Sequence, residues 1–304
     1  MSYVIDLDTP PRDGGETIAA GVRRAATEQI DKALDTLDAD DEERAERVHD
    51  VRKRMKKVRA ALRLVRDGIG EDVFDHENHA CRDTARLLAD ARDGKVHLDT
   101  LDALRKHYGD SLKRNAFSAI KESLETRRDE VNRQLIEAGT LDEVAERIRT
   151  VRARVPDWPI PHDGFDTARD GLKRVYKRGW KGLPNAYDDG SAEAFHEWRK
   201  RAKYLWYHLR LLGPLWPAVL DAWAGETHTL ANILGDDHDL AELRTAVAEG
   251  DVTEERDTLF ALIERRHADL RAAAHPLGRR LYVEKPAVFA DRIAAYWSIR
   301  HDVD

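Results

Sequence analysis

The stretch His49-x-x-Arg52-Lys53-Arg54-x-Lys56 occurs a second time, 147 positions later, as His196-x-x-Arg199-Lys200-Arg201-x-Lys203. A pattern that repeats within one chain indicates how the chain is organised before any single element is assigned. Around both copies, apolar residues recur every three or four positions, which is the period of an amphipathic helix. The sequence therefore predicts two related helices, over residues 48–65 and 195–212.

Each predicted helix carries basic side chains on one side. In a helix that turns about 100° per residue, these side chains project within an arc of roughly 80°, beside the apolar stripe. We call this set the basic ridge of each helix. The first ridge consists of His49, Arg52, Lys56, Arg59 and Arg63, and the second of His196, Arg199, Lys203, Trp206 and Arg210.

Positive charge is concentrated in these two segments. Residues 48–65 contain seven Lys or Arg and one acidic residue, and residues 195–212 contain five and one, which gives a combined net charge of +10. The whole chain has a net charge of −7, so the remaining residues must sum to −17. A concentrated charge of one sign produces a local field that attracts a polyanion. The pattern predicts a polyanion-binding site on the paired helices.

The composition is that of a folded helical protein without disulfides or membrane segments. The apolar residues are periodic throughout, which excludes a disordered chain. Cys81 is the only cysteine, so neither an intramolecular disulfide nor a cysteine-based zinc site can form. The first residues lack a signal-peptide pattern, and the Leu-rich residues 211–220 contain two prolines and are too short to span a bilayer. We expect a cytoplasmic protein without membrane association.

Helical patterns follow one another along the chain, and no segment alternates with the period of a β-strand. The fold class that this predicts is all-α. Thr140 and Glu143 form a capping-box pattern, and Ser191 precedes the second basic helix, so each is expected to begin a helix. Besides the basic helices, the predicted helices cover residues 15–37, 73–92, 98–138 with a break near 108–109, 140–154, 165–180, 217–234, 240–249, 254–274 and 286–300.

A proline-rich segment divides the chain into two halves. Residues 155–163 contain three prolines within six positions, which no helix tolerates. The repeat continues beyond the basic helices, because residues 87–93 align with residues 233–239. We therefore predict a first helical bundle over residues 1–154, a linker over 155–163 and a related second bundle over 164–304.

Together these motifs resemble those of one protein family, the CHAD family, whose name abbreviates "conserved histidine α-helical domain". The resemblance covers nearly the whole chain, and the order and spacing of its parts make it specific. These parts are the two basic helices, Gly-Leu-Lys-Arg-Val-Tyr-Lys-Arg-Gly at 171–179, Leu-Gly-Asp-Asp-His-Asp-Leu at 234–240 and Glu-Lys-Pro-Ala-Val-Phe at 284–289.

The resemblance implies two pseudo-symmetric antiparallel helical bundles, related by an internal repeat, with basic residues lining a central groove or pore that binds inorganic polyphosphate. It also implies no catalysis and no cofactor, and it suggests targeting to polyphosphate granules as one role. Trp206 and Tyr204 stand where such proteins usually carry basic residues, so the second ridge is expected to hold less charge than the first. The further site residues that the resemblance implies are Arg174, Arg178 and Lys285, with Lys113 and Arg114 on a helix of the first half.

Polyphosphate carries about one charge per phosphate and no base edges, so a protein can recognise it only by charge, hydrogen-bond donors and spacing. Arginine offers paired donors to the phosphate oxygens, and lysine offers a compact, rotatable one. Each ridge also includes a histidine, His49 or His196, and the surrounding cations should disfavour its protonation until an anion binds. We therefore expect the affinity to rise as the pH falls through the histidine range.

Two other functions fit parts of the sequence. Residues 236–239, together with His76, His79 and His196, contain the residue types of a metal-dependent phosphohydrolase, but the repeat counterpart of His238 is Arg92, which cannot ligate a metal in the same way. The acidic remainder of the chain would alternatively suit a helical scaffold for protein partners. Duplex DNA is less expected as a ligand, because the net charge is negative and the basic helices should pair inside the bundle. The oligomeric state is left open.

Overall fold

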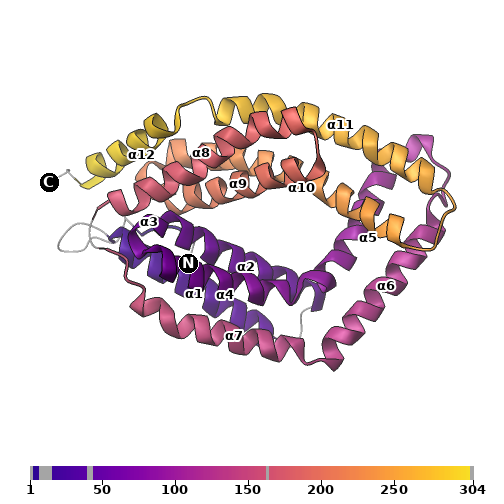
Figure 1. Ribbon diagram of the computed structural model, residues 1–304, viewed down its shortest axis with the longest axis horizontal. Helices are drawn as coiled ribbons and strands as arrows, with labels where there is room; N and C mark the ends of the chain where they lie inside the picture. Colours follow the sequence, from indigo (N-terminus) through magenta and orange to yellow (C-terminus); the bar gives the residue numbers. More distant parts are fainter. Residues whose placement is uncertain (1–2, 7–15, 40–43, 162–163, 302–304) are drawn as a thin grey trace.

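The computed structural model describes residues 3–6, 16–39, 44–161 and 164–301 (Figure 1). Within these ranges the chain forms helices and no β-strand, which confirms the predicted all-α fold class. The helices of the first half are α1 (Ile18–Asp38), α2 (Arg44–Leu64), α3 (Arg66–Ile69), α4 (Glu71–Arg86), α5 (Ala89–His107), α6 (Ser118–Glu137) and α7 (Thr140–Arg154). Those of the second half are α8 (Asp166–Asp189), α9 (Ala192–Leu211), α10 (Pro217–Glu249), α11 (Arg256–Leu281) and α12 (Pro286–His301). The short 3-10 turns are η1 (Gly109–Ser111), η2 (Val155–Asp157) and η3 (Gly213–Leu215).

The helices form two layers that are joined at one end (Figure 1). Helices α8 to α12 form one layer, α1 to α4 with α7 form the other, and α5 and α6 lie at the end where the layers are joined. The layers also touch through α2, which packs against both α8 and α9. The two basic helices, α2 and α9, therefore meet where the layers meet.

The contact of α2 with α8 and α9 is close. Gly171 of α8 lies against the backbone of Arg63 and Leu64, and a Cβ atom at this glycine would overlap the carbonyl oxygens of both residues. His208 of α9 is fully buried and donates a hydrogen bond of 2.9 Å to the carbonyl oxygen of Ala60. Burial lowers the pKa of His208 to about 4, so the ring links the two helices as a neutral group at pH 7.

Two hydrophobic clusters hold the molecule together. The larger one combines buried residues of α1, α2, α4 and α7 with buried residues of α8, α9, α10 and α12. The smaller one contains Leu101 of α5, Ile120 of α6, Leu243 of α10 and Ile263 of α11. Because each cluster includes residues from both halves of the chain, each half needs the other to bury its apolar side chains.

A contact between two loops closes the smaller cluster. The backbone N–H of Phe117, directly before α6, donates a hydrogen bond of 2.6 Å to the carboxylate of Glu255, directly before α11. Both residues have left-handed backbone conformations, with φ values of 63° and 58°. Such conformations cost about 1–3 kcal/mol each for residues other than glycine. The packing around the two loops must therefore be strong enough to hold them.

The described part of the proline-rich segment, residues 155–161, packs onto the first layer. Trp158 and Ile160 are buried, and Arg23 of α1 donates a hydrogen bond of 2.6 Å to the carbonyl oxygen of Trp158. Residues 162–163 of the predicted linker lie outside the described residues. The division of the chain into two domains at this segment stays a prediction.

Several predicted helix boundaries are wrong. Helix α10 is continuous, although a gap over residues 235–239 was expected, because Asp237 is held there by His267 and Arg271 of α11. Helices α8 and α11 run past Pro184 and Pro276 to their observed ends. The single helix expected over residues 73–92 is divided into α4 and α5 at a turn that buries Leu88 completely.

The two predicted helix caps have different outcomes. The hydroxyl oxygen of Ser191 accepts a hydrogen bond of 3.2 Å from the backbone N–H of Ala194 at the start of α9, as predicted. The capping box at Thr140 is wrong, because Thr140 is already the first residue of α7 and Gly139 is the N-cap. Gly139 has a φ of 61°, so the chain enters α7 through a left-handed turn that glycine adopts without strain.

Candidate functional site

The two basic ridges face each other across the contact between α2 and α9. The guanidinium carbon of Arg63 in α2 lies 4.2 Å from the centroid of the Tyr204 ring in α9. The Lys56 ammonium is close enough to Arg199 and Lys203 that both lower its pKa. We call the half-buried cations along this contact the cationic seam: Arg52, Lys56, Arg59 and Arg63 of α2, and Arg199, Lys200 and Lys203 of α9.

Two lysines of the seam have strongly shifted pKa values. Burial, followed by the charges of neighbouring basic residues, lowers the pKa of Lys56 to about 7. Burial and then Arg199 lower the pKa of Lys203 to about 8, although Asp239 acts in the opposite direction. In the part of the chain that the structure describes, neither lysine has a hydrogen bond or an ion pair. The unbound seam therefore disfavours its own positive charge, and an anion placed there would favour it.

The arginines of the seam on α2 are oriented by uncharged acceptors. Arg52 donates a hydrogen bond of 2.5 Å to the carbonyl oxygen of Ala85, and Arg59 donates one of 3.0 Å to the side-chain oxygen of Asn78. Arg63 donates to the carbonyl oxygen of Arg59 at 2.9 Å. A guanidinium has five N–H donors, and each of these bonds uses only one of them. The side chains are thus held in place while their charge and most of their donors stay available to a ligand.

The two motif histidines lie in different surroundings. His49 is the more exposed one, and partial desolvation of its ring, followed by the charge of Arg92, lowers its pKa. His196 lies against His238 of α10, with 3.8 Å and 35° between the two rings, and burial followed by His238 lowers its pKa to about 3. The expected direction is therefore observed in both cases. The largest cause is burial rather than the neighbouring cations.

Two side chains that the sequence analysis did not assign complete the site. Arg92 at the start of α5 lowers the pKa values of His49 and Lys56 of α2 and of Lys203 of α9, so it lies beside both helices of the seam. Ion pairs of 3.2 Å with Asp93 and 3.7 Å with Asp239 balance its charge. His238 occupies the corresponding place beside His196. Arg92 and His238 are matched positions of the continued repeat, residues 87–93 and 233–239. That alignment was the signal that could have identified them.

One end of the seam is extended by other arginines. Burial, followed by the charges of Arg201 and Arg66, lowers the pKa of Arg178, so this predicted residue lies beside the Arg63 end of the seam. The charge of Arg201 is partly balanced by Glu197, whose carboxylate accepts a hydrogen bond of 2.8 Å from it. The positive surface therefore continues from α9 to α8.

Other predicted site residues do not join the seam. Arg174 forms an ion pair with Asp67. Lys285 is exposed in the turn between α11 and α12. Arg210 lies further along α9, where its guanidinium carbon is 5.7 Å from the centroid of the Trp206 ring.

Lys113 and Arg114 come between α5 and α6 in the sequence, and these two helices meet at one end of the molecule (Figure 1). Both residues are exposed and belong to the loop between η1 and α6, so the prediction that they lie on a helix is wrong. The helix is interrupted there because the chain turns to bury Phe117 in the smaller hydrophobic cluster.

A cavity of about 1270 Å³ lies beside the seam, between α1, α2, α5, α10 and α11. His49 and Arg92 belong both to its lining and to the surroundings of the seam. Its charged lining residues are Arg54, Arg92, Lys95, Lys106 and Arg266 on the basic side, and Glu46, Asp50, Asp99, Asp236 and Asp239 on the acidic side. Because these charges balance, the excess of positive charge in this region belongs to the seam and not to the cavity as a whole.

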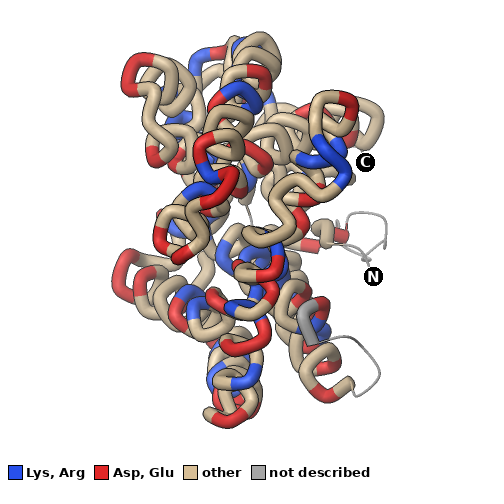
Figure 2. Tube along the Cα trace, turned by 90° about the vertical axis from the view of Figure 1, so that its right-hand side faces the viewer, with Lys and Arg blue, Asp and Glu red and all other residues tan. Residues whose placement is uncertain are grey.

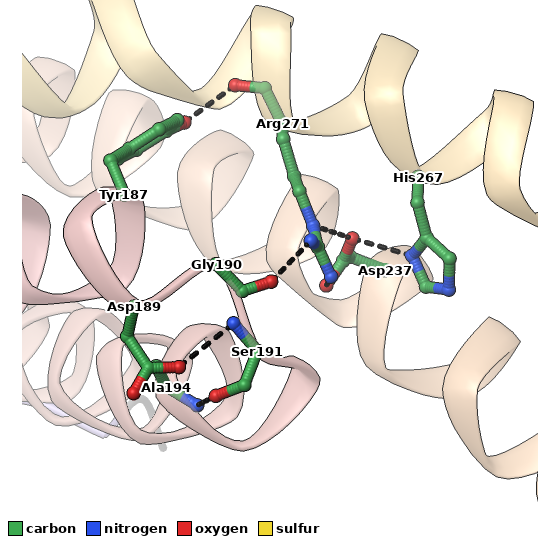
Figure 3. A network of polar contacts seen from close by, with 8 residues as sticks. All are labelled: Tyr187, Asp189, Gly190, Ser191, Ala194, Asp237, His267 and Arg271. Atoms are coloured by element: carbon green, nitrogen blue, oxygen red, sulfur yellow. Dashed lines mark hydrogen bonds and ion pairs between the residues drawn. The ribbon is translucent and has the colours of Figure 1, made fainter.

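A buried carboxylate fixes the α9 side of the site (Figure 3). Asp237 of α10 is 1% exposed and accepts hydrogen bonds of 2.7 Å from His267 and 2.8 Å from Arg271, both on α11. Burial alone would raise the pKa of Asp237, but these bonds lower it below its usual value. Arg271 also donates a hydrogen bond of 2.9 Å to the carbonyl oxygen of Gly190, just before α9. The network thus sets the positions of α9, α10 and α11 relative to one another.

Basic and acidic residues occur on both layers of the molecule (Figure 2).

Among the described residues, no group of three or more His, Cys, Asp or Glu side chains could hold a metal ion. A metal-dependent phosphohydrolase needs such a centre. None of the described helices is long and apolar enough to cross a membrane.

Comparison with known proteins assigns the family. The sequence pattern of the CHAD domain matches residues 24–248, so the chain belongs to the CHAD domain family. The solved structure of PptA from Streptomyces chartreusis is similar, with a TM-score of 0.60 and 15% sequence identity, over 88% of this chain and 98% of that chain. At this identity the similarity shows a common fold alone. No curated protein matches the sequence. CHAD domains are generally non-catalytic binding domains.

Proposed function

We propose that this protein binds inorganic polyphosphate, without catalysis, at the cationic seam. The observation that carries the proposal is that Lys56 and Lys203 are half-buried among other cations and have neither an ion pair nor a hydrogen bond within the described part of the chain. Asp239 lies near enough to Lys203 to raise its pKa but forms no ion pair with it. Buried charges are normally paired, because taking a charge out of water is costly. Lys200 of the seam is paired with Glu197, but the two unpaired lysines support a binding site for an anion that comes from outside the protein.

A chain of phosphates suits the length of the seam better than a single phosphate. Arg52 and Arg63 are separated by about 16 Å along α2, at roughly 1.5 Å per helical residue. Only an extended anion contacts both of these arginines and the lysines between them and on α9. Each additional contact is made within one complex, so affinity increases strongly with the number of contacts.

The position of the seam argues against duplex DNA as the ligand. Its side chains are half-buried between two packed helices, whereas a DNA-binding surface must lie open to a wide groove. The net charge of the whole chain, −7, also opposes a nucleic acid that covers a large surface.

Membership of the CHAD family supports the same ligand, because polyphosphate binding is the function inferred for this family. We extend the proposal to the architecture: residues 1–154 and 164–304 are two copies of one bundle, and the cavity beside the seam is part of a central pore. The corresponding cellular role is targeting of this protein to polyphosphate granules in the cytoplasm.

Titration with long-chain polyphosphate at several salt concentrations tests the proposal. Six contacts would give a slope of about −4 in a plot of log affinity against log salt, at roughly −0.7 per contact. The variant Lys56→Met/Lys203→Met should bind at least about 100-fold more weakly, since each charge-assisted hydrogen bond contributes about 1.5–3 kcal/mol. Competition with duplex DNA in the same assay tests the selectivity for polyphosphate.

Lys177→Met/Lys181→Met is the matched control, because it removes the same charge from two exposed positions of α8. It should bind polyphosphate nearly as well as the parent protein. Equal losses in the two variants, or a salt slope of only about −1, would contradict binding at the seam.

A further inference from the structure

A smaller hollow lies at the C-terminal end of α5, which is the end farther from the seam. It has a volume of about 280 Å³, and four of its seven lining residues are basic while one is acidic. The lining residues are Asp102, Arg105, Lys106, Gly109, Leu112, Lys113 and Arg114.

The acidic residue of this hollow is already neutralised. The carboxylate of Asp102 lies 2.8 Å from the Lys121 ammonium and 3.5 Å from the Arg105 guanidinium. Arg105 also donates a hydrogen bond of 3.1 Å to the carbonyl oxygen of Arg114, which holds the loop against α5. The charged ends of Lys106, Lys113 and Arg114 have no ion pair with any residue that the structure describes. Three positive charges are therefore unbalanced in one small space.

The small hollow and the large cavity share one lining residue. Lys106 lines both of them. Further along the same face of α5, Lys95 and Arg92 line the cavity, and Arg92 reaches the seam. Arg92 and Lys106 are separated by about 21 Å along the helix, at roughly 1.5 Å per residue. A flexible polyanion that extends from the seam along α5 to the small hollow therefore meets Arg92, Lys95 and Lys106, and it also passes Asp99.

We propose that Lys106, Lys113 and Arg114 form a distal anion site that binds the far part of a long inorganic phosphate chain whose near part lies in the cationic seam. This inference rests on the proposed function and adds selectivity for chain length. A chain long enough to cover the distance gains a second contact region within the same complex, which raises its affinity without a second binding event. A shorter chain binds at the seam alone.

A purely structural role for these cations predicts a different result. Lys106 lies in the last turn of α5, where a positive charge stabilises the carbonyl end of the helix dipole whether or not a ligand is present. Lys113 and Arg114 belong to no helix, and their side chains are exposed. Their replacement therefore tests ligand binding with little effect on the fold.

The experiment compares the distal variant Lys113→Ser/Arg114→Ser with a control variant, Arg279→Ser/Arg280→Ser. The control removes the same charge from two exposed positions in the last turn of α11. Each protein is titrated with tripolyphosphate and with length-fractionated long chains at one salt concentration. The distal variant should bind tripolyphosphate as the parent protein does and long chains roughly tenfold more weakly. Its salt slope for long chains should be smaller in magnitude by about 1.4, at roughly 0.7 per lost contact. The control should match the parent with both ligands.

Two results would overturn the inference in distinguishable ways. If the parent protein binds long chains tightly and the two double variants are equally affected, the distal site does not exist and the proposed function stands. If the parent protein binds neither ligand, the proposed function fails, and the distal site fails with it.

Discussion

The two copies of the repeated motif carry the same basic residues but differ in what lies beside them. In the first copy, His49 lies near the charged Arg92. In the second copy, the ring of His196 lies 3.8 Å from that of His238, centroid to centroid, and both rings have pKa values of about 3. The first histidine therefore lies beside a guanidinium that Asp93 and Asp239 balance, and the second lies beside a neutral ring.

Further along the helices, the first ridge again carries a charged side chain where the second carries an uncharged one. Arg59 of the first ridge donates to Asn78 and keeps its charge at the seam. The matched position of the second ridge is Trp206, whose ring stacks on His228 with 4.1 Å between centroids. Under the proposed function, we therefore expect the first copy to provide more of the attraction for a polyanion, while Trp206 of the second copy serves packing.

The helices behind the ridges also differ. Asp237 of α10 is held by two basic side chains of α11, whereas the matched position in the first half, Ala91, is simply packed in the larger hydrophobic cluster. The repeated motif thus carries the same basic residues in both halves, while the contacts that support its helix differ between the halves.

The largest effect is expected at Asp237. Asp237→Ala leaves Arg271 and His267 without their buried partner, so the free energy of unfolding should fall by about 3–5 kcal/mol. Because its pKa lies below the usual value of 3.8, this contribution is present above about pH 4 and is lost as the pH falls further. Urea unfolding at pH 7 and at pH 3 measures both effects. The control is Glu226→Ala on an exposed site of α10, and an equal loss there would contradict the role of the network.

The lysines of the two copies should respond differently to pH. Binding favours the charged form, and the pKa values of Lys56 and Lys203 are about 7 and 8, so affinity should fall as the pH rises from 6 to 9. Two pH units above its pKa, Lys56 can account for a loss of up to roughly 100-fold. Lys56→Arg should therefore flatten the profile more than Lys203→Arg. Unchanged profiles in both variants would show that neither lysine meets the ligand.

The histidines of the two copies should contribute differently to binding at lower pH. We expect affinity to rise by less than roughly tenfold between pH 7 and pH 5, and His49→Ala/His196→Ala should reduce this rise. His49→Ala alone should account for most of the reduction, because the pKa of His196, about 3, keeps that ring neutral in this range. Calorimetric titrations of the parent, the single variants and the double variant test this. The same pH dependence in all four would leave the histidines as packing residues.

The smallest effect is expected when the second ridge is made more like the first. Trp206→Arg should raise the affinity for long-chain polyphosphate about fivefold, which corresponds to roughly 1 kcal/mol. The salt slope should steepen by about 0.7, as for one added contact. Trp206→Leu is the control for loss of the stacking on His228. A gain of the same size in both variants would mean that charge at this position does not matter.

Much of the fold was predictable from the periodicity of apolar residues, because that periodicity directly reflects which side of a helix is buried. The helix ends were less predictable, since they depend on tertiary contacts. Residues 235–239 look like a helix end, yet the bonds of Asp237 to α11 keep them helical. The turn at Phe117 depends equally on a partner, Glu255, that is 138 residues away.

The site was predictable to the extent that it lies on single helices. Helical geometry placed Arg52, Lys56 and Arg63 on one arc, and the structure brings this arc against α9. Which residues from other helices join the site could not be derived from the periodicity of α2 and α9. Arg92 and His238 come from α5 and α10, and only the alignment of the continued repeat links them to the motif.

The central claim is that both copies of the motif hold one phosphate chain between α2 and α9. A crystal structure of the protein with long-chain polyphosphate tests it most directly. We expect phosphate density in the seam, with Lys56 and Lys203 contacting the same chain. A chain bound on the outer surface of either layer, with both of these lysines unoccupied, would contradict the claim.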